Sequence, residues 1–159
     1  ISANAERIKI VSQERITDEL NKIIMSEKPS VGFKILFDTK LLHIIFPKMV
    51  ELYGIDTING KSHKDNFYHT LQVLDNVAEK SDNLWLRWAA ILHDIAKPDT
   101  KRFDTKVGWT FHGHEDRGAL HARRRVRLEL PQDTRLAVRV GIASGVVIAL
   151  PLNDTRPGV

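Results

Sequence analysis

One apolar segment, residues 81–97, constrains the fold more than any other part of the chain. Its sequence, SDNLWLRWAAILHDIAK, opens with polar residues that can cap a helix and is then apolar on nearly all sides. A helix of that kind lies in the middle of a core, because no side of it can face water cheaply. We expect other helices to surround this segment and Pro98 to end it.

The composition is globular, with 159 residues of which 42% are hydrophobic and 28% charged, and this length suffices for one ordinary domain or for one small domain plus an accessory piece. No apolar run approaches the ~18 residues of a membrane span, so we expect no membrane partner. The N-terminus alternates apolar and charged residues, unlike a secretory signal, and cytoplasmic location is the default expectation. Because the chain has no cysteine, a metal site in it would have to use His, Asp or Glu.

The remaining periodicity predicts an all-α fold. Residues 12–26 place apolar side chains on one face, with Ser12 able to cap the start of that helix. Residues 29–54 indicate two or three short helices, and residues 66–80 an amphipathic helix. Residues 56–65 between them predict a polar loop with an Asn-Gly turn.

The second half of the chain is less regular. Residues 101–111 predict a short hairpin or an ordered loop, because apolar and polar residues alternate around Trp109. Residues 114–130 indicate a basic helix. From residue 141 onward, glycines, prolines and a β-branched run favour an irregular tail.

His93 and Asp94 stand side by side near the end of the central apolar segment. Burying both costs several kcal/mol unless something pairs with them. If the helix over residues 66–80 packs antiparallel to the central helix, its early residue His69 faces this pair. Two imidazoles and one carboxylate can share a divalent cation, with Mn, Fe, Co, Ni, Zn and Mg all compatible. The alternative is a core histidine that is hydrogen-bonded and binds no metal.

Such a cation would leave positions open for water, and bound hydroxide can attack a phosphorus or carbonyl centre. Asp94 and Lys97 are therefore the candidate catalytic residues. Lys97, one turn after Asp94, could meet a phosphate oxygen, or it could simply pair with Asp94 or Asp99. In FHGHE, His112 or His114 could bind the metal, a second metal or a phosphate; each could equally be a loop histidine bonded to its own backbone.

Positive charge is concentrated between residues 100 and 140, which hold ten Lys or Arg against five Asp or Glu. This span includes a run of arginines, Arg123, Arg124, Arg125 and Arg127. Such a run favours partners that carry phosphate, either RNA or a phosphorylated small molecule. The alternative is a solvated helix face without a partner.

His69, followed by His93 and Asp94 in ILHDIAKP, resembles the HD superfamily of metal-dependent phosphohydrolases. A longer stretch, about residues 10 to 138, resembles one branch, the bacterial CCA-adding tRNA nucleotidyltransferases and related poly(A) polymerases. NFYHTLQVLDNV, LRWAAILHDIAKP, WTFHGHEDRGA and RLELPQDTRL carry this resemblance. It implies an HD-domain-like helical bundle preceded by a small helical subdomain, with a tRNA-like RNA as partner. It also implies a metal held by His69, His93 and Asp94, with His114 as a further ligand.

The resemblance divides the chain into a neck-like, RNA-binding subdomain (1–55), an HD domain (56–140) and a divergent tail (141–159). The nucleotidyltransferase head of the family would precede residue 1, so we do not expect this chain alone to add nucleotides. Members of the HD superfamily complete the metal site with a late Asp or His. The corresponding stretch here, RVGIASGVVIAL, offers neither, and we expect no similarity to the family after about residue 139.

Three hypotheses about function follow. The chain could be the RNA-binding, HD-containing portion of a protein resembling the tRNA nucleotidyltransferases. It could be a self-standing, metal-dependent HD phosphohydrolase that acts on nucleotides or phosphate esters. It could also be a degenerate helical domain without activity, which the missing late ligand favours.

Overall fold

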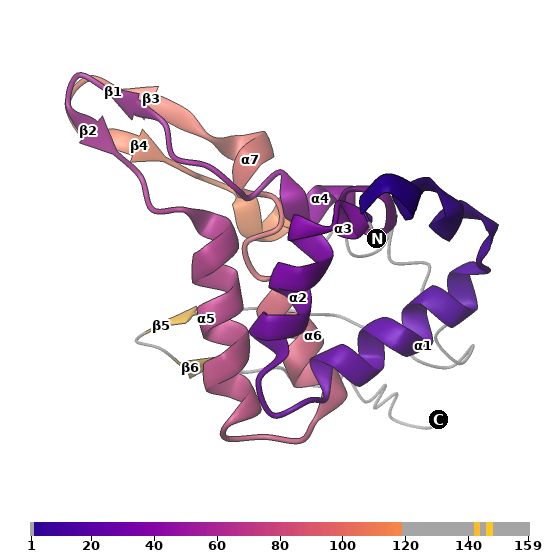
Figure 1. Cartoon of the computed structure of the whole chain (residues 1–159). Coiled ribbons are helices and arrows are strands. Elements are labelled where there is room, and N and C mark those ends of the chain that lie inside the picture. Colours follow the sequence, from indigo (N-terminus) through magenta and orange to yellow (C-terminus); the bar gives the residue numbers. More distant parts are fainter. Residues whose placement is uncertain (1, 119–141, 144–145, 148–159) are drawn as a thin grey trace, which may run out of the picture.

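The computed structural model describes residues 2–118, 142–143 and 146–147, and helices make up most of them (Figure 1). The helices are η1 (Ser2–Ile10, a 3-10 helix), α1 (Gln13–Ile24), α2 (Pro29–Asp38), α3 (Leu41–Ile45), α4 (Pro47–Val50), α5 (Asn66–Ala78), α6 (Leu84–Leu92) and α7 (Lys97–Thr100). Residues 114–118 begin a further helical turn. The predicted all-α class is confirmed. Within the described part, no helix has the length and apolar character to cross a membrane.

The short strands form three antiparallel hairpins. They are β1 (Thr57–Ile58) with β2 (Lys61–Ser62), β3 (Arg102–Asp104) with β4 (Gly108–Thr110), and β5 (Ile142–Ala143) with β6 (Val146–Val147). The hairpin predicted within residues 101–111 is thus confirmed. Residues 56–65, expected to be a loop, hold a hairpin instead, because Asn59 and Gly60 take positive φ angles of 51° and 74° and turn the chain tightly.

The first helices begin at the residues that the sequence marks. Ser12 caps α1, and its side chain accepts a hydrogen bond from the backbone N–H of Arg15. Pro29 and Pro47 lie in the first turns of α2 and α4, where proline costs no hydrogen bond. Pro47 therefore starts a helix as well as ending the preceding one.

Helices α5 and α6 lie side by side and antiparallel at the centre of the body, joined by a short loop (Figure 1). The middle of α6 is buried on all sides, as its sequence predicts. One hydrophobic core includes side chains from α1 to α4 and from α5 and α6, among them Ile24, Phe33, Leu42, Met49, Phe67, Leu71, Leu74 and Ile91. Each such side chain contributes about 1.5–3 kcal/mol through its burial.

Helix α6 ends earlier than the sequence suggests. The apolar pattern continues to Lys97, yet the α-helix stops at Leu92, and residues 93–96 form turns before α7. His93 is the C-cap residue, and its side chain bonds to the carbonyl oxygen of Ala90. The expectation that His93 and Asp94 lie inside the helix was therefore wrong, and both lie in the turn that follows it.

Arg87 is a buried arginine in α6, with only 2% of its surface exposed. Its guanidinium lies where α1 and α5 end, and helix ends expose carbonyl oxygens that need donors. It donates to the carbonyl oxygens of Ile24, Ser26, Ala78 and Ser81 and to the carboxylate of Asp82, at 2.9–3.1 Å. Arg87 thus ties the first part of the chain to the α5–α6 pair.

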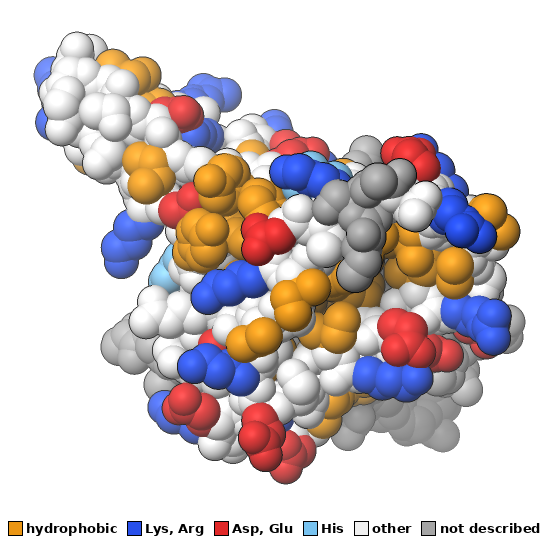
Figure 2. Space-filling view, in the orientation of Figure 1, with side chains coloured by type: hydrophobic (Ala, Val, Ile, Leu, Met, Phe, Trp, Pro, Cys, Tyr) orange, Lys and Arg blue, Asp and Glu red, His pale blue; other side chains and the backbone are white. Residues whose placement is uncertain are grey.

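The hairpins β1–β2 and β3–β4 lie together and form an arm that projects from the helical body (Figures 1 and 2). The indole Nε1 of Trp109 donates to the carbonyl oxygen of Lys61 at 3.0 Å. In return, Lys61 Nζ donates to the carbonyl oxygen of Lys106 at 3.1 Å. An ion pair between Asp56 and Lys101 joins the two hairpins at the root of the arm.

Candidate metal centre

The imidazole of His93 is fixed in one orientation. Its Nδ1 lies 2.7 Å from the carbonyl oxygen of Ala90, which can only accept, so Nδ1 carries a proton. In the neutral ring, Nε2 then presents a lone pair. That atom lies 3.1 Å from Oδ2 of Asp94, and the two residues are only 7% and 2% exposed.

This contact places two acceptors against each other in the interior. Among the described residues, Nε2 of His93 has no hydrogen-bond partner. Such an arrangement is costly unless a positive charge lies between the two atoms. A proton on Nε2 or a divalent cation would each supply it, and the donor set of imidazole and carboxylate suits a cation.

His69 completes the group from the neighbouring helix. It lies in the first turns of α5, and its ring centroid is 5.9 Å from that of His93, with the planes at 70°. One ligand atom from each of His69, His93 and Asp94 can be chosen so that all lie within 4.8 Å of one another. The antiparallel packing of α5 against α6 thus brings together the three residues that the sequence predicts.

The local electrostatics favour the protonation states that metal binding requires. Burial alone raises the pKa of Asp94, but a proton on Nε2 of His93, when it is present, and the ammonium of Lys97 outweigh burial and lower the pKa to about 2. Asp94 is therefore a carboxylate. Burial also lowers the pKa of His69, against the attraction of Asp94, which raises it. Its imidazole is neutral at neutral pH and free to act as a ligand.

Two further side chains meet Asp94. Lys97 Nζ lies 2.7 Å from Oδ2 of Asp94 and 5.5 Å from the ring centroid of Phe111. His114 Nε2 lies 3.5 Å from Oδ1, and its Nδ1 is held by the carbonyl oxygen of Phe111 at 2.8 Å. His114 thus borders the centre, whereas His112 is exposed.

The sequence did not reveal what orients the histidines. Backbone carbonyls of Ala90 and Phe111 each hold one Nδ1 and turn the corresponding Nε2 toward Asp94. Every residue has a main-chain carbonyl, so no residue type in the sequence indicates which carbonyl a histidine will contact. Each of these two carbonyls belongs to the residue three positions before its histidine. The four arginines predicted to bind phosphate, Arg123, Arg124, Arg125 and Arg127, lie outside the described residues. So does most of the stretch in which the late ligand of the family was expected to be missing.

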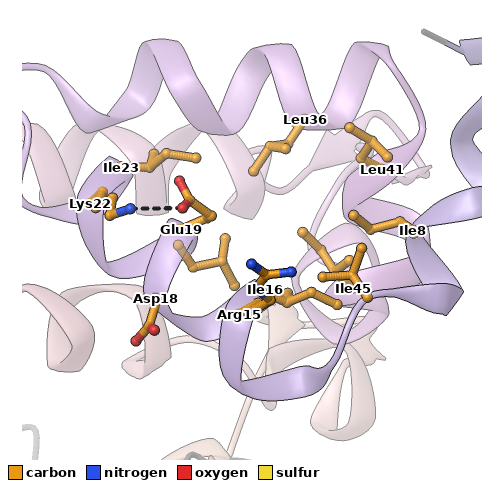
Figure 3. Close-up of a pocket in the computed structure, with 12 residues that line it drawn as sticks. Ile8, Arg15, Ile16, Asp18, Glu19, Lys22, Ile23, Leu36, Leu41 and Ile45 are labelled. Carbon is orange, nitrogen blue, oxygen red and sulfur yellow. Dashed lines mark hydrogen bonds and ion pairs between the residues drawn. The ribbon is translucent and has the colours of Figure 1, made fainter.

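A separate groove lies in the first part of the chain (Figure 3). It has a volume of about 640 Å³ and lies between η1, α1, α2 and α3. Apolar side chains such as Ile16, Leu36 and Ile45 line it, and an ion pair between Lys22 and Glu19 at 2.7 Å lies beside it. No residue of the candidate metal centre contributes to this groove.

Two family models match the chain in succession. Residues 1–52 match the family described as "Probable RNA and SrmB- binding site of polymerase A". Residues 66–140 match the HD domain. The second range contains His69, His93, Asp94 and His114.

Curated relatives are similar over most of the chain. The A-adding tRNA nucleotidyltransferase of Deinococcus radiodurans is 32% identical over 157 residues, covering 96% of this chain and 36% of the relative. The Multifunctional CCA protein of Shewanella frigidimarina is 34% identical over 119 residues, covering 73% and 28%. The CC-adding tRNA nucleotidyltransferase of Thermus thermophilus is 33% identical over 121 residues, covering 70% and 26%.

The chain spans about a third of the length of these relatives. The alignment with the Deinococcus relative leaves out about six of the 159 residues, so it extends past residue 139. The expectation of no similarity beyond that point was wrong for this relative. The two family models and these relatives point to the same family. The chain belongs to the bacterial CCA-adding tRNA nucleotidyltransferase and poly(A) polymerase family and corresponds to its HD-domain-containing region.

Proposed function

We propose that this chain is an RNA-holding region and that its partner is a tRNA-like RNA. The observation that carries the proposal is the continuous similarity to tRNA nucleotidyltransferases, with a model for RNA binding matched over residues 1–52. The net charge of +4 and the arginine run at residues 123–127 support a polyanionic partner. The proposed division into residues 1–55, 56–140 and 141–159 is supported by the matched ranges.

Binding of tRNA at several salt concentrations tests this proposal. We expect the logarithm of the affinity to fall linearly with the logarithm of the salt concentration, because phosphate contacts release counterions. Arg124→Glu should weaken binding and make the slope shallower by about one unit or more. Lys80→Glu is the matched control, since Lys80 is exposed beyond the end of α5. An affinity for tRNA that does not change with salt concentration would contradict the proposal. Equal losses of affinity in Arg124→Glu and Lys80→Glu would contradict it as well.

A second function is favoured by the unpartnered Nε2 of His93, which faces the carboxylate of Asp94 at 3.1 Å. We infer that His69, His93 and Asp94 hold a divalent metal ion, with His114 as a further ligand. A bound ion of this kind would supply a hydroxide nucleophile for phosphate-ester hydrolysis. The partner would then be a nucleotide or another phosphorylated small molecule.

In this second function, the protein groups have separable roles. Asp94 stays ionised and balances the charge of the ion. Lys97 is placed by its 2.7 Å contact with Asp94 to reach a phosphate oxygen that enters the site. The Nδ1 bonds of His93 and His114 to backbone carbonyls keep both Nε2 atoms aimed at Asp94.

Metal analysis of the purified chain, together with hydrolysis of a generic phosphodiester, tests the second function. Asp94→Asn keeps the size of the side chain while removing its charge, and it should abolish both metal content and turnover. Lys97→Ala should keep the metal and lose turnover. A metal-free wild-type protein that stays inactive when Mn²⁺ or Zn²⁺ is added would leave the inactive helical domain as the better hypothesis.

A further inference from the structure

The chain contains only two tyrosines, Tyr53 and Tyr68, and the fold places them together on the surface. Their ring centroids are 6.0 Å apart with the planes at 68°, and the residues are 52% and 47% exposed. Ile55 beside them is exposed as well. Figure 2 shows hydrophobic side chains gathered at the surface where the arm meets the body. Large exposed aromatic side chains that touch each other mark a binding surface more often than single ones do.

The inner side of this pair is anchored in the core. The fully buried ring of Phe67 lies 5.4 Å from Tyr68 and 6.3 Å from Tyr53, centroid to centroid. Phe37 lies 4.9 Å from Tyr53. The tyrosines therefore have packed inner edges and solvent-facing outer surfaces. Neither phenol hydroxyl has a hydrogen bond with any residue that the structure describes.

One carboxylate fixes the backbone beside both tyrosines. Asp65 caps α5, and its Oδ1 accepts the N–H of Tyr68 at 3.1 Å. Its Oδ2 accepts the N–H of Gly54 at 2.9 Å, and Gly54 has a φ of 111° that favours glycine. The two rings are thus set in place before any ligand arrives, which lowers the entropic cost of binding.

Two exposed lysines are the candidate cations of this surface. Lys40 Nζ is 5.5 Å from the ring centroid of Phe37, on which Tyr53 packs. The backbone of Lys40 takes a positive φ of 66°, an uncommon conformation for a residue with a side chain. Lys64 is exposed and directly precedes the capping residue Asp65. Exposed rings with ammonium groups close by match the chemistry of unpaired nucleotides, whose bases stack and whose phosphates need cations.

We propose that Tyr53 and Tyr68 form a stacking platform for unpaired bases of RNA, with Lys40 and Lys64 contacting the phosphates. This inference rests on the proposed RNA binding and names the surface that takes single-stranded nucleotides. The planes at 68° cannot both stack on one base, so each ring takes a separate base. Tyr68 directly precedes His69 on α5, and the two side chains point away from the helix axis in different directions.

Two kinds of variant test the platform: one replaces the tyrosine ring by an apolar side chain without a ring, and the other keeps the ring. The Kd of the full chain is measured for a labelled single-stranded oligoadenylate and for a blunt RNA duplex of equal length. Tyr53→Leu and Tyr68→Leu should each weaken single-strand binding by about ten-fold, the size of one lost base stack, with duplex binding unchanged. Tyr53→Phe and Tyr68→Phe keep the ring and should bind as the wild type does. Equal effects of Leu and Phe, or equal losses for strand and duplex, would overturn the platform.

A footprint on the wild-type protein tests the same point without any variant. A tyrosine-nitrating reagent modifies exposed phenol rings, and the chain offers only two of them and no competing cysteine. Oligoadenylate should slow nitration of both Tyr53 and Tyr68, read by mass spectrometry, and the duplex should not. If the wild type binds tRNA in a salt-dependent way but neither tyrosine is protected, only the platform is wrong. If it binds no RNA at all, the proposed function fails together with the platform.

Discussion

The helical body and the projecting arm are each stabilised internally, but by different interactions. The body has one apolar core in which side chains such as Phe33, Leu74 and Ile91 are fully buried. The arm has no comparable core. Its hairpins are joined by the bonds between Trp109, Lys61 and Lys106, by ring contacts of Trp109 with His63 and Phe103, and by the Asp56–Lys101 pair.

The candidate metal centre lies where these two regions meet. His69, His93 and Asp94 come from the body, whereas Phe111 and His114 follow directly after β4 of the arm. His93 and Asp94 are fixed by burial, His69 is half-buried on α5, and polar contacts position the residues that follow the arm. The body therefore positions the three candidate ligands, and the segment that follows the arm supplies residues at the edge of the same candidate site.

The largest effect is expected from Arg87→Ala in the body. Removing the guanidinium leaves carbonyl oxygens at the ends of α1 and α5 without donors in the interior, and it opens a cavity. We expect a loss of about 3–5 kcal/mol in the free energy of unfolding. Urea denaturation followed by circular dichroism measures it. Arg15→Ala, on the exposed side of α1, should change stability by less than about 0.5 kcal/mol.

Smaller effects are expected on metal affinity. The loss should be greater for a candidate ligand of the body than for the residue that follows the arm. His69→Ala should lower the affinity for Zn²⁺ by more than about 100-fold, beyond the range of an outer-sphere change. His114→Ala should lower it by about 10-fold, because His114 approaches Asp94 only at 3.5 Å. Isothermal titration measures both. A reversed order would show that the periphery, and not the body, holds the ion.

Trp109→Ala should loosen the arm and leave the body almost unchanged. Trp109 contacts Lys61, His63, Phe103 and Lys101, and it is not among the side chains of the hydrophobic core. We expect faster amide hydrogen exchange in β1 to β4 and a change in the global free energy of unfolding of about 1 kcal/mol or less. Protection factors that fall equally in α5 and α6 would show that the arm and the body unfold as one unit.

The smallest effect concerns pH at the root of the arm. The hydrogen bond and the charge of Lys101 lower the pKa of Asp56 below its usual 3.8. Because the folded-state pKa is the lower one, the pair stabilises the arm above about pH 3.8. That contribution is lost as the pH falls through the folded-state value. Amide exchange in the arm should therefore increase slightly in acid. Asp56→Asn should remove the part of this dependence that comes from the Asp56–Lys101 pair and leave exchange in α6 as it was, while Asp104, whose pKa is lowered by the N–H groups of Val107 and Lys106, still contributes its own part.

Much of the helical body could be predicted from sequence because its signals are local. Apolar spacing and capping residues mark α1, α2 and α5, and the antiparallel connection from α5 to α6 brings His69 to His93 and Asp94. What escaped prediction depends on contacts between distant residues. Arg87 looks like an exposed charge within a helix, and only the meeting of the ends of α1 and α5 makes its burial favourable.

The arm and the tyrosine platform were missed for the same reason. The pattern over residues 101–111 predicts a hairpin, but nothing local indicates that it lies against residues 57–62, some 45 positions earlier. Tyr53 and Tyr68 likewise belong to separate elements, and the bonds of Asp65 to Gly54 and Tyr68 bring them together. The early end of α6 reflects a side-chain bond of His93 that competes with the helical pattern.

The contacts of Arg87 also bear on how such chains diverge. In α1 and the turn after it, the guanidinium recognises only the main-chain oxygens of Ile24 and Ser26, which every amino acid provides. A substitution at the exposed Ser26 therefore leaves its anchoring oxygen in place, whereas the side chain of Ile24 is fixed by its own burial in the core. An inserted or deleted residue would shift both oxygens away from the guanidinium, so homologous pieces could be exchanged between lineages only where that turn keeps its length.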